Sequence, residues 1–173
     1  MNILAINPGH NASAALVRNG ILEYFIEEER LSRHKYDGNP FMAMLEAMEY
    51  EIDVLLLGGT TTEFHSLPWT GEDAYSALVR KKYPKVKIYN LGNEHHLGHA
   101  ASAFYGSGFE TAAAIVIDGA GSWHGVENSG GFETESIYVC SYPNIFKPVL
   151  KKYGGATDGK NIKTENLELN DAV

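Results

Sequence analysis

The 173-residue chain has little cysteine, no excess of basic residues and no long uninterrupted hydrophobic run. Its one cysteine, Cys140, cannot form an internal disulfide, which favours a reducing compartment over a disulfide-stapled secreted fold. The net charge of −8, with no basic run, argues against nucleic acid or an anionic membrane as a general partner. The first apolar stretch is interrupted by Asn7, Pro8 and Gly9, so it fits neither a signal peptide nor a spanning helix. We therefore expect a soluble, cytoplasmic protein.

Two common nucleotide-binding signatures are also missing. The chain has no Gly-Lys-Ser/Thr loop, and after Gly119 and Gly121 the third glycine position of a dinucleotide fingerprint is occupied by His124. A hydrophobic fraction of 44% with 11% aromatic residues is typical of a globular chain, and the length allows one domain or two small lobes.

Hydrophobic patterning predicts a first lobe in which three strands precede alternating helices and strands. Asn19-Gly20 lies between two β-prone segments, which is the strongest short signal for a hairpin with a type I′ turn. Thr70 and Asp73 resemble a capping box, and Asn93 is a candidate helix cap. The expected elements are strands at 2–7, 13–17, 21–26, 53–59 and 86–89, and helices at 40–50, 70–82 and 94–105.

This βββαβαβα order predicts an α/β fold with a mixed sheet, an antiparallel meander joined to parallel crossovers, as in a ribonuclease H-like lobe. A second lobe is expected to start with strands at 111–117 and 132–142, and a helix is expected at 166–173. We place the boundary near Phe109, giving a first lobe of residues 1–109 and the beginning of a second lobe at 110–173.

The histidine group at 95–99 is the most informative segment for function. On a helix, His95 and His99 are four residues apart and project from one face, a spacing that lets two imidazoles bind one metal ion. Asp118, at the end of an apolar strand, could complete a His, His, Asp set that suits iron(II), manganese or zinc. Two plainer interpretations stay open: structural histidines on an alanine-rich helix, and an aspartate that only initiates the following turn.

The turn at 118–122 resembles a phosphate-holding loop, because Gly119 and Gly121 permit close backbone approach and Ser122 adds a hydroxyl. A plain β-turn is nearly as good an interpretation of these residues alone. His10, in the turn between the first two strands, could act as a donor or general base, and Lys35 could hold a phosphate. Both residues also fit ordinary solvated loops, and the charged stretch at 27–30 fits an exposed rim.

Four segments in this order resemble the O-carbamoyltransferase family of the nodulation-protein U and cephem carbamoyltransferase type. They are NPGHNASAAL at 7–16, EEERLSRHK at 27–35, HHLGHAASAFY at 95–105 and IDGAGS at 117–122. Asn11 stands where the family commonly has aspartate, and Tyr36 stands where it often has histidine. The change at Tyr36 could alter the contacts of the acyl site.

The resemblance implies an actin-like ATPase fold related to the tRNA threonylcarbamoyl transferases. It implies an iron-type metal held by His95, His99 and Asp118, with a further aspartate ligand from later in the family's chain. It also implies that His10 and Lys35 lie at a site where carbamoyl phosphate and ATP form a carbamoyl-adenylate, which then acylates a hydroxyl group of a small molecule or sugar.

The same resemblance leaves the completeness of the chain open. The rest of the second lobe and the adenylating domain would have to come from a C-terminal portion, in cis or as a second chain. The alternatives are a non-catalytic lobe that binds a metal or nucleotide, and a relative of the tRNA threonylcarbamoyl transferases. The polyanionic substrate of the last group fits poorly with a charge of −8.

Overall fold

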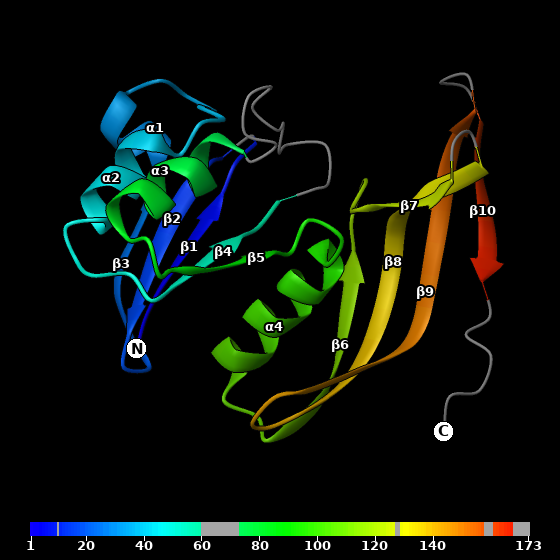
Figure 1. Cartoon of the computed structure of the whole chain (residues 1–173). Helices are drawn as coiled ribbons and strands as arrows, with labels where there is room; N and C mark the ends of the chain where they lie inside the picture. The colour runs from blue at the N-terminus through cyan, green and yellow to red at the C-terminus, as the bar shows by residue number, and fades with distance from the viewer. Residues whose placement is uncertain (10, 60–72, 127–128, 158–160, 168–173) are drawn as a thin grey trace. The chain divides into compact units, whose positions relative to one another are not determined.

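The computed structural model describes residues 1–9, 11–59, 73–126, 129–157 and 161–167 (Figure 1). The chain divides into two compact units, Met1–Gly92 and Asn93–Val173. Each unit has a sheet of its own, and each is described separately below.

The sheet of the first unit is mixed, as expected. Its strand order is β3-β2-β1-β4-β5. β1 is antiparallel to β2, and β2 to β3, whereas β4 is parallel to both β1 and β5. The strands are β1 (Asn2–Asn7), β2 (Ser13–Arg18), β3 (Ile21–Glu27), β4 (Val54–Leu57) and β5 (Lys87–Asn90).

The hairpin between β2 and β3 forms as the sequence predicts. Asn19 has φ 50° and Gly20 has φ 85°, the positive values that the two central residues of a type I′ turn require. This turn sets the antiparallel pairing of Arg18 with Ile21.

Three helices accompany this sheet: α1 (Glu28–Ser32), α2 (Phe41–Ala47) and α3 (Ala74–Lys82). Because side chains alternate between the faces of a strand, every second residue of β1 and β4 points to the same buried face. The resulting core joins the sheet to α2 and α3 through Leu4, Ile6, Leu16, Ala43, Met44, Leu55, Leu57 and Val79.

The second unit consists of one helix and a second sheet, whose path is β10-β9-β8-β6 with β7 paired to β8. All its pairings are antiparallel. Its elements are α4 (His95–Ser107), β6 (Thr111–Ile117), β7 (Trp123–Val126), β8 (Ser129–Ser141), β9 (Ile145–Thr157) and β10 (Asn161–Leu167).

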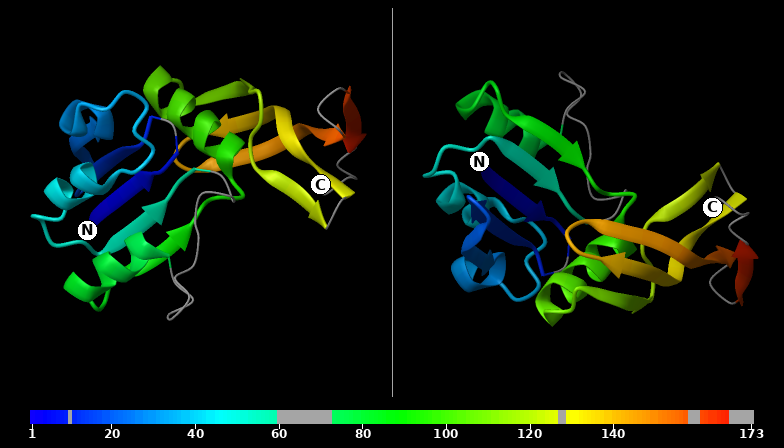
Figure 2. Two further views of the ribbon diagram at one scale, coloured as in Figure 1. Left: turned by 90° about the horizontal axis from the view of Figure 1, so that it is seen from above. Right: turned by 90° about the horizontal axis from the view of Figure 1, so that it is seen from below.

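Helix α4 lies beside β6 in both views of Figure 2. Its buried residues, His96, Ala100 and Phe104, recur every four positions and form the stripe that packs on the sheet. Ala100 and Phe104 share a core with Ala114, Val116, Tyr138 and Cys140. The structure therefore groups α4 with β6 and β8, so the boundary between compact units falls before this helix rather than near Phe109.

Several expected details differ in the structure. Asp73 is itself the cap of α3 and accepts a hydrogen bond from Ser76 N, and Thr70 lies outside the described residues. Glu94, without a side-chain hydrogen bond, occupies the cap position of α4 that was expected for Asn93.

The helix expected at 166–173 is wrong for Asn166 and Leu167, the part of it that the structure describes. Asn166 and Leu167 belong to β10 rather than to a helix, because the polar segment pairs in register with β9. Residues 168–173 lie outside the described part. The helix α1 and the strands β7, β9 and β10 were not expected.

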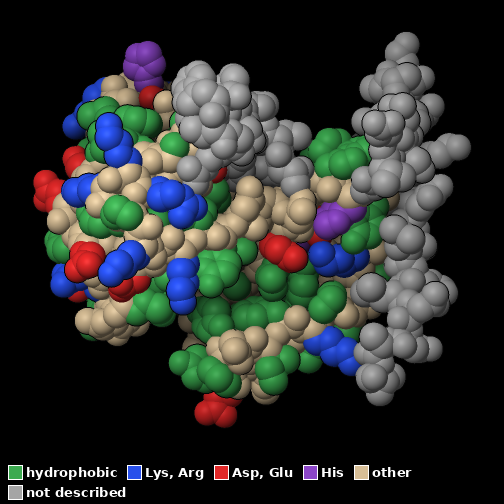
Figure 3. All heavy atoms as spheres, in the orientation of Figure 1, with side chains coloured by type: hydrophobic (Ala, Val, Ile, Leu, Met, Phe, Trp, Pro, Cys, Tyr) green, Lys and Arg blue, Asp and Glu red, His purple; other side chains and the backbone are tan. Residues whose placement is uncertain are grey.

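No helix within the described ranges is long and apolar enough to cross a membrane. Hydrophobic side chains nevertheless gather on the surface around α4 and β6 (Figure 3). Ile115 and Ile117, on β6, are 67% and 78% exposed. Within the described residues β6 is an edge strand of its sheet.

Candidate metal centre

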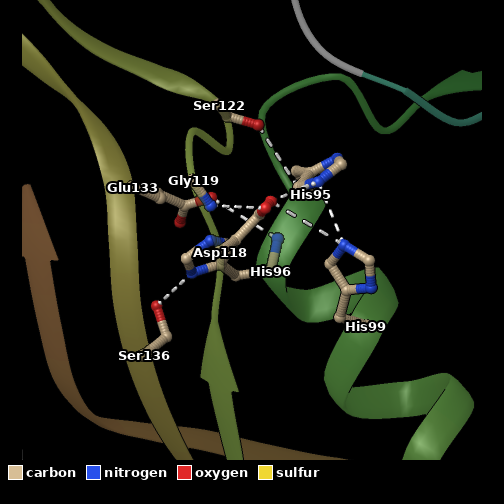
Figure 4. A network of polar contacts seen from close by, with 8 residues as sticks. All are labelled: His95, His96, His99, Asp118, Gly119, Ser122, Glu133 and Ser136. Atoms are coloured by element: carbon tan, nitrogen blue, oxygen red, sulfur yellow. Dashed lines mark hydrogen bonds and ion pairs between the residues drawn. The ribbon is translucent and has the colours of Figure 1, made fainter. Parts of the chain in front are cut away.

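His95, His99 and Asp118 meet at the start of α4 (Figure 4). The Nε2 atom of His95 lies 3.0 Å from Oδ2 of Asp118 and 3.1 Å from Nε2 of His99. The third side of this triangle, from His99 Nε2 to Asp118 Oδ2, measures 3.9 Å. The structure thus brings together the three residues that the sequence proposed as a set.

Local structure explains the convergence. One helical turn separates the two histidines, so both rings project from the same face of α4 and meet edge to face with centroids 4.6 Å apart. Asp118 follows β6 directly, and its backbone N–H donates to Thr134 O on β8. Its Oδ1 accepts a 2.6 Å hydrogen bond from Gly119 N, which leaves Oδ2 directed at the histidines.

The three atoms fit a shared cation better than they fit one another. An imidazole nitrogen carries either one proton or one lone pair, so His95 Nε2 cannot make good hydrogen bonds to both of its close neighbours. Two atoms bonded to one cation at about 2.0–2.2 Å lie roughly 3–4 Å apart, and all three separations fall in that range. Two imidazoles and a carboxylate are suitable ligands for iron, manganese or zinc.

The charge of Asp118 is also suited to a cation. Burial alone would raise its pKa, but the Gly119 N–H and the two histidines more than offset this effect, so the pKa lies below its usual range. The carboxylate is therefore ionised at neutral pH without a metal present.

A second polar cluster lies behind the histidines, and its members His96, Glu133 and Ser136 are fully buried. The ring of His96 makes a 2.7 Å hydrogen bond through Nδ1 with Ser136 Oγ on β8. Glu133, also on β8, accepts a 2.6 Å hydrogen bond from Lys151 Nζ and a longer one, 3.4 Å, from His96 N. Burial lowers the pKa of His96, which keeps this imidazole neutral at neutral pH.

Glu133 and Lys151 form an ion pair. Burial alone would raise the pKa of Glu133, yet the hydrogen bond and charge of Lys151 outweigh it and lower the pKa. The pKa of Lys151 is raised for the reciprocal reason: burial alone would lower it, but the carboxylate of Glu133 dominates.

Residues of the predicted phosphate-holding turn hydrogen-bond to Glu133 and His95. Gly121 N donates to Glu133 O, and Ser122, which is fully buried, accepts a 3.3 Å hydrogen bond from His95 N through its Oγ. Gly119 is exposed, and its N–H is bound to the carboxylate of Asp118. That these three residues bind a nucleotide stays a prediction.

A groove of about 310 Å³ lies between α4 and β6 and ends at the candidate metal centre. Its sides are mostly apolar, from Ala100 and Ala103 on the helix and residues 114–117 on the strand, and His99 and Asp118 also line it. His99 is 55% exposed against 23% for His95, so the centre is open to solvent on the His99 side.

The two expected catalytic residues belong to the first unit. His10 lies outside the described residues. Lys35 is exposed, with Nζ 4.7 Å from the centroid of the Tyr36 ring. The two motif segments nevertheless meet, because Glu28 N donates to Ala12 O and Ser13 pairs with Glu27.

One charged segment differs from its interpretation as an exposed rim. Glu28 is 2% exposed and accepts hydrogen bonds from Met42 N and Ala43 N at the start of α2. Its neighbour Glu29 accepts from Tyr36 N.

Comparisons with known proteins cover the segment that carries this site. Residues 60–138, which include all three candidate ligands, match the family model described as Carbamoyltransferase N-terminus. Over these residues the chain is therefore similar to the N-terminal part of carbamoyltransferases. It is 28% identical to Nodulation protein NolNO of Sinorhizobium fredii, with 78% of this chain and 23% of that protein covered. It is 27% identical to the uncharacterized protein sll1178 of Synechocystis, with 66% of this chain and 24% of that protein covered.

The chain spans about a quarter of the length of these curated relatives. Its match includes α4, β6 and most of β8, the elements that carry the candidate ligands and, of the polar cluster behind them, His96, Glu133 and Ser136.

Sequence reasoning did not find His96, Ser136, Glu133 and Lys151. A usable signal existed for Ser136, which alternates in phase with the buried residues Tyr138 and Cys140. No such signal existed for Glu133, because an irregularity in the pairing of β8 with β9 between residues 133 and 135 shifts the phase.

Proposed function

We propose that this chain is part of an enzyme that transfers a carbamoyl group from carbamoyl phosphate to a hydroxyl group of a small molecule or sugar. In this proposal ATP is a cosubstrate and carbamoyl-adenylate the intermediate, as the resemblance of the four sequence motifs implies. The match to the carbamoyltransferase family model and the similarity to Nodulation protein NolNO support carbamoyl transfer in general. A cytoplasmic location agrees with the single, buried cysteine.

We further propose a ribonuclease H-like lobe of the actin-like ATPase type for the first unit. Its support is the order β3-β2-β1-β4-β5, with a meander of antiparallel strands followed by two parallel ones. The second sheet also begins with antiparallel strands, β6, β8 and β9.

The convergence of His95 Nε2, His99 Nε2 and Asp118 Oδ2 is the observation that carries the proposal. These residues would hold a divalent metal ion, of iron(II) type by resemblance. When bound, such an ion supplies positive charge that offsets phosphate oxygens and orients a phosphate-containing substrate. Asp118 contributes the only negative charge of the set, so the site keeps a net attraction for anions once a divalent ion is present.

Other residues have roles that rest on the motifs. Lys35, exposed in the first unit, would pair with a phosphate or carbamoyl oxygen, and His10 would accept the proton of the attacking hydroxyl. Gly119, Gly121 and Ser122 would lie near the nucleotide phosphates.

A metal-binding measurement tests the first step. Titration of the purified chain with Mn²⁺, Zn²⁺ and, without oxygen, Fe²⁺ should show one site by calorimetry. His99→Ala should weaken binding by more than the roughly 10- to 100-fold that loss of a hydrogen-bond partner behind a ligand costs. His34→Ala, which removes an exposed histidine of the first unit, is the control and should not change the affinity. Equal affinity in both variants would remove the basis of the proposal.

A transfer assay tests the second step. We propose that the reaction needs the remainder of a family-length polypeptide, in cis or as a second chain, since the chain spans about a quarter of its relatives. The chain alone should bind metal weakly and transfer no carbamoyl group to sugar hydroxyls, and addition of a C-terminal portion should restore transfer. Turnover by the purified chain alone would contradict this.

A further inference from the structure

The three histidines at the start of α4 divide between two environments. His95 and His99 project toward Asp118, whereas His96, one residue further round the helix, is fully buried against the sheet (Figure 4). A buried polar ring on the inner face of a helix needs a reason, because an apolar side chain would pack there at less cost.

The contacts of His96 supply that reason. Its Nδ1 is 2.7 Å from Ser136 Oγ, so the ring is fixed to the middle of β8. Its Nε2 has no hydrogen-bond partner among the described residues. Because an unpaired N–H is costlier to bury than an unpaired lone pair, we assign the proton to Nδ1, which donates to Ser136.

The other side of the ring meets the turn that carries Asp118. A Cβ atom placed on Gly121 would lie 2.8 Å from both Cδ2 and Nε2 of His96. No side chain fits at that distance, so the turn can approach the ring this closely only with glycine. Gly121 therefore has a packing role that does not depend on a nucleotide.

His96 consequently touches every element that supplies the candidate ligands. It belongs to the helix that carries His95 and His99, it packs on the turn after Asp118, and it is bonded to β8, whose Thr134 O accepts from Asp118 N. A shift of this ring would change the separation between the two imidazoles and the carboxylate.

We propose that His96, fixed by Ser136 and Gly121, is a positioning residue that sets the spacing between His95, His99 and Asp118 for a divalent metal ion. The inference rests on the proposed metal site. A ligand set held at the correct spacing before binding avoids the cost of ordering, and loss of a partner behind the ligands typically weakens metal affinity about 10- to 100-fold.

Titration with Co²⁺ tests the proposal, because the visible absorption of Co²⁺ depends on its coordination geometry. Ser136→Ala removes the hydrogen bond and keeps the ring, and Gly121→Ala pushes the ring away. Both variants should bind Co²⁺ about 10- to 100-fold more weakly and show a changed absorption spectrum. His96→Ala should do the same, and His96→Asn, which can still donate to Ser136, should recover part of the affinity.

Two matched controls make the same chemical changes on α4 away from the ring. Ser102→Ala and Gly106→Ala replace exposed positions of this helix, and a Cβ at residue 106 would contact nothing within 4 Å. Both should bind Co²⁺ as the parent chain does. Hydrogen exchange of the β8 segment identifies any variant that fails to fold, and the conclusion is drawn from the folded ones.

The outcomes separate the two proposals. If the parent chain binds no metal, the metal site itself is wrong and the role of His96 is overturned with it. If the parent chain binds Co²⁺ and folded Ser136→Ala and Gly121→Ala bind it with the same affinity and spectrum, the metal site stands and the positioning role is wrong.

Discussion

Among the described residues each compact unit buries one glutamate, and the two carboxylates have different partners. Glu28, in the first unit, accepts hydrogen bonds from two backbone N–H groups, those of Met42 and Ala43. Glu133, in the second unit, is bonded to the ammonium of Lys151 and lies 3.5 Å from Nε2 of His124.

The difference shows how the two units use polar groups. The core around Glu28 is otherwise aliphatic, and this carboxylate only satisfies amides that the start of α2 would leave free. Glu133 belongs to a network of ionisable side chains that reaches the candidate metal centre through His96 N. The buried carboxylate of the first unit therefore completes a helix end, whereas that of the second unit contacts the helix that carries two candidate ligands.

Matched substitutions of the two glutamates should have unequal effects, and this is the largest effect we expect. Glu133→Gln leaves the ammonium of Lys151, whose side chain is 13% exposed, without a counter-charge, which should cost about 3–5 kcal/mol of the stability of the second unit. Glu28→Gln loses one charge-assisted hydrogen bond and should cost about 1.5–3 kcal/mol in the first unit. Hydrogen exchange, followed by mass spectrometry of peptides from each unit, measures both changes.

A double substitution checks the cause. In Glu133→Leu with Lys151→Met the unpaired charge is absent, so most of the lost stability should return. If the double variant is as unstable as Glu133→Gln, or if the two glutamine variants cost the same, the proposed contrast between the units is wrong.

Much of the fold was predictable because its signals are local. The hairpin at Asn19-Gly20 needs only two residues with positive φ, and the strands around Leu4 and Leu55 show continuous apolar runs. β9 and β10 were not predictable in the same way. The first part of β9 is mostly apolar but is interrupted by Pro148, and the end of β9 and most of β10 are polar or glycine-rich. The pairing of β9 with β8 and with β10 stabilises strands there that the sequence does not favour.

The candidate site was likewise predictable only where its signals are local. The spacing of His95 and His99 and the position of Asp118 after an apolar strand are visible in the sequence, and the structure brings the three together. The partners behind them come from β8 and β9, and the contact of His96 with Ser136 spans 40 residues of the chain. Only the register of the sheet, including its irregularity near Glu133, decides which side chains reach the helix.

Acid should reduce the stability cost of Glu133→Gln. The pKa of Glu133 in the folded protein lies below the ordinary value of 4.5, so its ion pair contributes fully above about pH 4.5 and is lost as the pH falls through the folded-state pKa. The stability gap between the parent chain and Glu133→Gln should therefore be constant from pH 7 to 5 and close at lower pH. Denaturant unfolding at a series of pH values measures the gap, and a gap that widens in acid would contradict the ion pair.

The smallest effect concerns two glycines that are required for different reasons. Gly20 has φ 85°, and a Cβ added there would meet nothing within 4 Å, so Gly20→Ala adds only backbone strain, about 1–2 kcal/mol in the first unit. Gly121 has no such φ and is instead limited by the ring of His96. Gly20→Ala should thus lower the unfolding midpoint without changing Co²⁺ affinity, whereas Gly121→Ala should weaken Co²⁺ binding. If Gly20→Ala weakened Co²⁺ binding as much as Gly121→Ala does, metal affinity would follow general stability, and the polar network of the second unit would have no special part in holding the ligands.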